Sequence, residues 1–265
     1  MPTQAVAVPA ADRRRRTTMT VVLGLLLVAA LFAAGAVGGL KAVGGEDGGH
    51  ASPVSSAPPT GQARAGAGEQ PTVPGWRTVT NPRTGVVFDV PPEWGRKPAS
   101  WASYVVEDGD PEEKPLVGFS APAVLKEKWC VSDVDVDGSS DETWLAAAGS
   151  RTERGARTPQ EAARDNASLW VYGGYAQPDR AKVTEGAAEP YTTASGIRGS
   201  VATASSAGVE PEGKCDTDGT ATTFAFKNDK GDIVSWTFTG AKGVDEEVPD
   251  ATVRKILSTV RLAGG

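Results

Sequence analysis

Residues 220–240, TATTFAFKNDKGDIVSWTFTG, predict a β-hairpin. Threonine, phenylalanine, isoleucine, valine and tryptophan recur in the two arms, and these residue types favour extended backbone. The arms are separated by Asn228–Gly231, a polar group ending in glycine that is typical of a turn. This is a strong strand signal, and it indicates a domain built on antiparallel pairs.

Other segments extend the same pattern. Residues 76–80 (WRTVT) and 85–92 (GVVFDVPP) predict a second hairpin, with its turn at Asn81–Gly85. Two further strands are expected within 100–108 and 115–125, and weaker strand signals lie at 188–195 and 197–206.

Helix signals are fewer. Thr158-Pro159-Gln160-Glu161 is a capping box with proline in the first turn, and it predicts a helix ending near Gly173 and Gly174. A last helix is expected from about Pro249, because apolar residues recur there at helical spacing. Since the helices do not alternate strictly with the strands, the pattern favours the α+β class.

The N-terminal part is a different kind of chain. Residues 13–16 are four arginines, and the 24 residues from Thr17 to Leu40 carry no charge. Such a segment is long enough to span a bilayer, and the arginines place its N-terminal side in the cytoplasm. We therefore expect a cytoplasmic tail (1–16) and a transmembrane helix (17–40), with the remainder outside the cell membrane. The alternative is a signal peptide cleaved near Ala34–Ala36.

Residues 41–75 are rich in Gly, Pro, Ser and Ala and have almost no large apolar side chain, so we expect a disordered linker. Residues 76–265 form the predicted extracytoplasmic domain. The first 75 residues have a net charge of +2 and the whole chain −6, which leaves −8 for the domain. This balance argues against nucleic acid and against docking on anionic lipid.

The chain has two cysteines, Cys130 and Cys215, and outside the membrane such a pair is most simply a disulfide. A reactive free thiol is the alternative. The one histidine, His50, lies in the linker, and no nucleophile-elbow, P-loop or dinucleotide-binding motif is present. We therefore expect no catalytic residues and no cofactor, and the remaining enzymatic alternative is a carboxylate pair acting on glycan.

Residues 129–144, WCVSDVDVDGSSDETW, resemble the start of a calcium loop, with Asp133, Asp135, Asp137 and Gly138 in sequence. The position of the final bidentate glutamate is Trp144, however. We therefore expect a strand, a glycine turn and a helix over 141–149, capped by Ser139 and Glu142, and no metal. Weak calcium binding by Asp133, Asp135 and Asp137, aided by Asp216 and Asp218 across a disulfide, stays the alternative.

Trp76 begins the first predicted strand, and the other six of the seven tryptophans follow it in the domain: 94, 101, 129, 144, 170 and 236. Most should be core, since aromatic side chains bury a large area. We expect one or two to be exposed, where aromatic rings can line a sugar or peptide groove.

GVVFDVPPEW (85–94) and ATVRKILSTVRL (251–262) resemble the signature of the PsbP/Mog1/LpqN-like fold. The whole domain, with a cysteine near mid-chain and another in GKCDTDG (213–219), also resembles an uncharacterised family of membrane-anchored extracytoplasmic actinobacterial proteins. The resemblance implies a central antiparallel sheet flanked by helices and an accessory or binding role, and it supplies no catalytic residues. This chain lacks the lipidated cysteine of LpqN-like lipoproteins.

Taken together, these patterns predict a single-pass membrane protein with an extracytoplasmic, non-catalytic binding or accessory domain. Its partner would be an envelope protein or the cell wall. No pattern identifies a ligand or an oligomeric state.

Overall fold

The computed structural model describes residues 70–133 and 140–264. The predicted tail, transmembrane helix and most of the predicted linker lie outside these residues. Among the residues that are described, no helix has the length and apolar character needed to cross a membrane.

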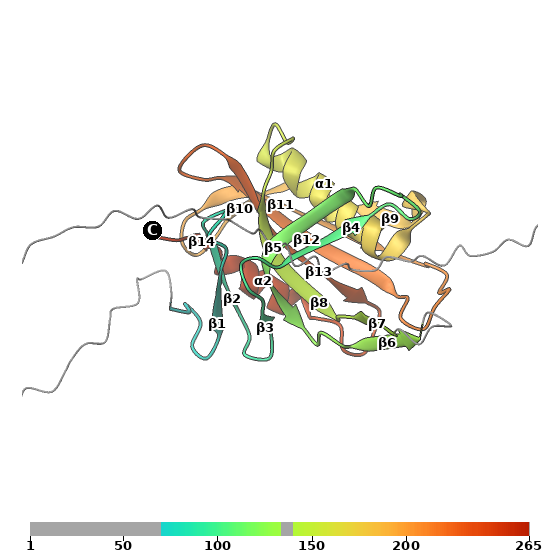
Figure 1. Ribbon diagram of the computed structural model, residues 1–265. Coiled ribbons are helices and arrows are strands. Elements are labelled where there is room, and N and C mark those ends of the chain that lie inside the picture. The colour runs from blue at the N-terminus through green and yellow to red at the C-terminus, as the bar shows by residue number, and fades with distance from the viewer. Residues whose placement is uncertain (1–69, 134–139, 265) are drawn as a thin grey trace, which may run out of the picture. The chain divides into compact units, whose positions relative to one another are not determined.

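Most of the domain is one antiparallel sheet of nine strands (Figure 1). Across the sheet the order is β10 (Glu189–Thr192), β11 (Arg198–Ser206), β12 (Asp218–Lys227), β13 (Ile233–Lys242), β8 (Ala146–Thr152), β5 (Pro115–Leu125) and β3 (Gly95–Arg96). β4 (Ala102–Val106) also pairs with β5, and β9 (Val183–Glu185) with β11. The predicted hairpin at 220–240 is confirmed as β12 and β13, which pair over ten residues each in the middle of this sheet.

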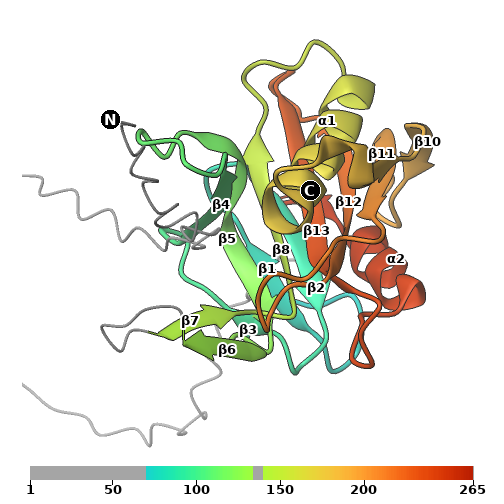
Figure 2. The ribbon, with the colours of Figure 1, turned by 90° about the vertical axis from the view of Figure 1, so that its right-hand side faces the viewer.

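Two smaller sheets complete the strands. β1 (Arg77–Thr80), β2 (Val86–Val90) and β14 (Arg261–Leu262) form a three-stranded sheet, which confirms the second predicted hairpin. β6 (Cys130–Asp133) and β7 (Ser140–Thr143) pair only with each other in the described structure and project from the rest of the domain (Figure 2).

The two faces of the large sheet differ because side chains alternate along β13. Val234, Trp236 and Phe238 point to one face, where they share a core with β2 and with α2 (Asp250–Ser258). Ser235 and Thr237 point to the other face, which α1 (Pro159–Val171) covers. The large sheet is therefore buried on both sides, in an α+β arrangement.

Helix α1 begins as its capping box predicts, since the Thr158 side chain accepts a hydrogen bond from the backbone N–H of Glu161. Its end differs from the expectation: the chain continues as a π-helical turn, Tyr172–Ala176, followed by a short 3₁₀ helix, Arg180–Lys182. The Tyr175 ring lies against the backbone of Gly219, where an added Cβ would be 2.1 Å from the ring. Small residues on this face of the sheet thus let α1 and its extension approach closely.

The helix expected over 141–149 is wrong. Residues 140–143 form β7, and Ala146–Thr152 form β8, a strand paired on both sides by β13 and β5. A run of alanines favours a helix locally, but here the alanines are buried between neighbouring strands. Gly149 lies under Phe119, where an added Cβ would be 2.5 Å from the ring. Tertiary packing overrides the local preference.

Candidate functional site

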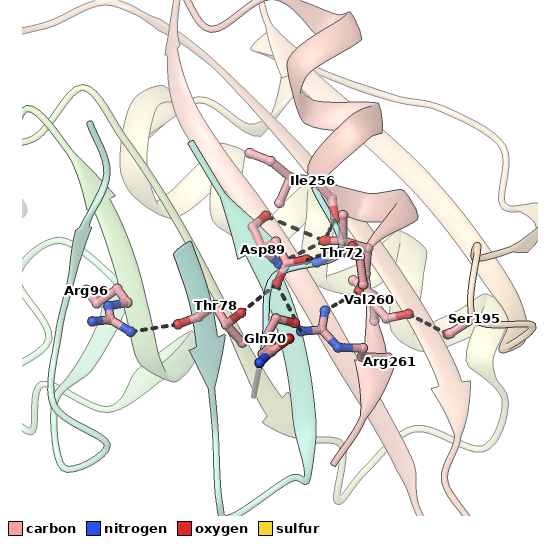
Figure 3. Close-up of polar contacts among 10 residues, drawn as sticks. Gln70, Thr72, Thr78, Asp89, Arg96, Ser195, Ile256, Val260 and Arg261 are labelled. Atoms are coloured by element: carbon pink, nitrogen blue, oxygen red, sulfur yellow. Dashed lines mark hydrogen bonds and ion pairs between the residues drawn. The ribbon is translucent and has the colours of Figure 1, made fainter. Parts of the chain in front are cut away.

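The start and the end of the domain meet at a buried carboxylate (Figure 3). Oδ2 of Asp89 accepts hydrogen bonds from the backbone N–H (2.6 Å) and hydroxyl (2.7 Å) of Thr72. Oδ1 accepts from the Thr78 hydroxyl and from Nη2 of Arg261, both at 3.0 Å. The Arg261 guanidinium also donates to the backbone oxygen of Gln70 at 3.0 Å.

This cluster, which we name the terminal junction, consists of Gln70, Thr72, Thr78, Asp89 and Arg261. The Asp89 side chain is fully buried, and that of Arg261 is 10% exposed. Removing one partner of such a pair would leave the other charge uncompensated. The junction is therefore a structural anchor, and it holds residues 70–72, which the sequence placed in the linker, against the domain.

The Cys130–Cys215 disulfide is present. It ties the start of β6 to the loop before β12, across 85 positions of sequence. Next to it, the Lys214 ammonium donates to the backbone oxygen of Val131 at 3.2 Å. The bridge therefore fastens the small β6–β7 sheet to the rest of the domain.

The metal alternative depends on residues that the structure does not all describe. Asp135, Asp137 and the side chain of Asp133 lie outside the described part. On the other side of the disulfide, Asp216 accepts from the backbone N–H groups of Glu212 and Gly213. Asp218 accepts in the same way from residues 208 and 209. Asp216 and Asp218 thus shape their own turns, and the described residues contain no group of three or more metal-ligating side chains.

Buried carboxylates bear on the glycan-enzyme alternative. Besides Asp89, the Glu153 side chain is 6% exposed, and its Oε1 accepts from Asn166 and Ser235 at 2.6 and 2.5 Å. Arg151 pairs with the same oxygen at 3.4 Å. These contacts join β8, β13 and α1, so Glu153, like Asp89, has a structural role.

The tryptophans divide into two groups. Four are buried, as expected for core: 94, 144, 170 and 236. The other three, Trp76, Trp101 and Trp129, are half-buried, and each contacts a charged side chain. Two of these three, Trp101 and Trp129, lie around the end of strand β5.

We name this region the β5 corner: Lys97, Trp101, Lys126, Glu127, Trp129 and Glu246. The Lys97 ammonium lies 4.5 Å from the centre of the Trp101 ring and pairs with Glu127. The Trp129 indole N–H donates to Glu246 at 2.7 Å, and Lys126 donates to the other oxygen of that carboxylate at 2.9 Å. Both tryptophans are thus held in place by lysine–glutamate pairs.

The backbone of the corner is unusual. In the described part three non-glycine residues have positive φ, and two of them, Ala121 (50°) and Lys126 (47°), lie here. Ala121 lies within the shift of the β5–β8 register between Ser120 and Ala123, and its N–H donates to the backbone oxygen of Trp101. Strained conformations of this kind concentrate at functional sites, so the corner is our candidate site.

Electrostatic interactions at Glu246 hold the Trp129 side chain in place. The pKa of the Glu246 carboxyl is lowered, first by its bond from Lys126 and then by the bond from the Trp129 indole. The carboxylate therefore stays ionised, and keeps its hydrogen bond to the indole, at pH values below the usual pKa of a glutamate.

Of the residues in this site, the sequence analysis singled out only Trp101 and Trp129. The charged residues of the KEKW segment (126–129) beside Trp129 could have indicated Lys126 and Glu127 as well. No feature of the neighbouring sequence indicates Glu246.

A second polar cluster was also missed. The hydroxyl of Tyr172, in the π-helical turn, donates to Glu107, and Arg180 lies 3.7 Å above the same ring. Burial, and next the bond to Glu107, raise the pKa of Tyr172 to about 12. The cluster joins the β4–β5 turn to the end of α1, which is a structural role.

Comparison with known proteins gives a family. No curated protein matches the chain. The model of one family matches residues 69–265, which include all the residues that the structure describes. The chain belongs to this family, the domain of unknown function DUF8017.

Proposed function

We propose that this protein is a single-pass membrane protein whose domain binds a component of the cell envelope outside the membrane, without catalysis. In this proposal residues 1–16 are cytoplasmic, 17–40 span the membrane and the linker carries the domain. The observation that carries the binding role is the β5 corner, where two half-buried tryptophans are held by charged partners on a strained backbone.

The location rests on two features. The four arginines before the uncharged segment favour a cytoplasmic N-terminus. The disulfide favours an oxidising compartment, since such bonds are rare where thiols are kept reduced. We extend the same proposal to the finer fold, as a PsbP/Mog1/LpqN-like domain from an actinobacterial envelope protein, on the resemblance of residues 85–94 and 251–262.

The terminal junction supports presentation on a linker. It fastens residues 70–72 to the buried Asp89, so the tethered chain leaves the domain at a fixed point. The net charge of −8 on residues 76–265 supports a partner other than nucleic acid or anionic lipid.

Sedimentation with an insoluble cell-envelope fraction tests the proposal. Kept in detergent, so that its proposed membrane anchor does not itself sediment, the full-length chain should sediment with the detergent-extracted envelope fraction, and Trp101→Ala or Trp129→Ala should remove most of that binding. Trp76→Ala is the matched control, because Trp76 is also half-buried beside a lysine but lies outside the corner. Absence of binding, or equal binding by all three variants, would contradict the proposal.

A further inference from the structure

The β5 corner carries no net charge on a strongly acidic domain. Lys97 and Lys126 balance Glu127 and Glu246, and these four side chains pair with each other in two ion pairs. A surface that binds a polyanion needs an excess of positive charge, and one that binds a basic segment needs an excess of negative charge. The corner has neither, so its charge balance fits an uncharged ligand.

The polar groups of the corner are also arranged for hydroxyls. The side chains of Glu127, Lys126 and Glu246 are 46–51% exposed, so they remain accessible while they are paired. Each carboxylate has further lone pairs to accept from a hydroxyl, and each ammonium has further protons to donate. A ligand rich in neighbouring hydroxyls could therefore bond to both members of a pair at once.

The tryptophans supply the apolar part. The Glu246 bond fixes the orientation of the Trp129 indole, and Lys97 lies over the Trp101 ring. Lys126 and Glu127, adjacent in the chain, connect the two tryptophans. Lys126 pairs with Glu246, which binds the Trp129 indole, and Glu127 pairs with Lys97, which lies over the Trp101 ring. Pre-oriented rings lose little conformational entropy when a flat apolar surface binds to them.

We propose that the β5 corner binds a neutral polysaccharide, with Trp101 and Trp129 each stacking on a different sugar ring. The ion pairs Lys97–Glu127 and Lys126–Glu246 bond to the hydroxyl groups along the edges of these sugars. This inference rests on the proposed binding function, whose partner class it names.

The test is titration of the full-length chain with N-acetylglucosamine oligomers, followed by calorimetry and by the seven indole N–H resonances in NMR spectra. Because one sugar can reach only one ring, the tetramer should bind about ten-fold more tightly than the single sugar N-acetylglucosamine. The tetramer should shift the Trp101 and Trp129 resonances and leave those of Trp94, Trp170 and Trp236 in place. The NMR readout uses the unaltered chain and so does not depend on the folding of a variant.

Variants complete the experiment. Trp101→Ala or Trp129→Ala should reduce tetramer affinity to that of the single sugar, and Trp76→Ala should leave it unchanged. Equal affinity for all oligomer lengths, shifts outside the corner, or no binding would overturn the inference. If the chain sediments with the envelope through the corner but ignores the oligomers, the glycan inference fails and the proposed binding function stands. If it binds neither, the proposed function fails as well.

Discussion

Replacing Asp89 by asparagine tests the terminal junction. The substitution keeps the shape of the side chain but removes the charge that faces Arg261, whose side chain is 10% exposed. It also turns one acceptor into an amide N–H₂, which must then face either the backbone N–H of Thr72 or the Arg261 guanidinium, both donors. Breaking a buried pair from one side costs about 3–5 kcal/mol, and we expect that loss in the free energy of unfolding.

Urea unfolding followed by tryptophan fluorescence measures this loss. All seven tryptophans lie at position 76 or beyond, so the signal comes from the domain even in the full-length chain. The matched control is Asp165→Asn in the exposed Arg164–Asp165 pair, which should change stability by less than about 1 kcal/mol. Replacing both partners, as Asp89→Asn with Arg261→Met, should cost less than the sum of the single changes. If Asp89→Asn costs no more than the control, the junction does not anchor the domain.

Three further changes give independent tests. Gly219→Ala should destabilise the domain by about 1–3 kcal/mol, because the new Cβ collides with the Tyr175 ring. Gly155→Ala is the control, because nothing lies within 4 Å of its added Cβ. Equal melting temperatures of the two variants would contradict this expectation. Cys130→Ser should remove about 4–5 kcal/mol of stability, the chain-entropy contribution of a bridge across 85 positions, and an unchanged urea midpoint would refute that part. As pH falls, the Trp129 indole resonance should shift with a midpoint below the ordinary glutamate pKa of about 4.3. The reason is that Glu246, whose pKa is lowered, stays ionised and keeps its bond from the indole until the pH falls below that value. A midpoint at or above about 4.3 would be inconsistent with this reasoning.

Local sequence patterns were sufficient to predict the elements that depend on neighbouring residues alone. The β12–β13 hairpin, the β1–β2 hairpin and the α1 capping box all follow from residues close in sequence, and the structure confirms them. Residues 146–152 show where this fails. Their alanines fit a helix by propensity, yet they form a strand because β13 and β5 bury them from both sides.

The candidate site could be predicted only in part, for a related reason. The tryptophans are visible as residues, but their exposure depends on partners from distant segments: the Trp129–Glu246 bond spans 117 positions. The Asp89–Arg261 bond spans 172. No local spacing marks such pairs. The cysteine pair was predictable because two cysteines allow a single pairing.

The central claim, that this domain lies outside the cell membrane, is tested most directly with Cys130→Ser in the full-length chain. The change frees Cys215, which is half-buried in the loop before β12, as the one thiol of the protein. In intact cells a membrane-impermeant maleimide should label Cys215 as fully as it does after lysis, and the unaltered chain should stay unlabelled. Labelling that appears only after lysis would place the domain in the cytoplasm and contradict the account.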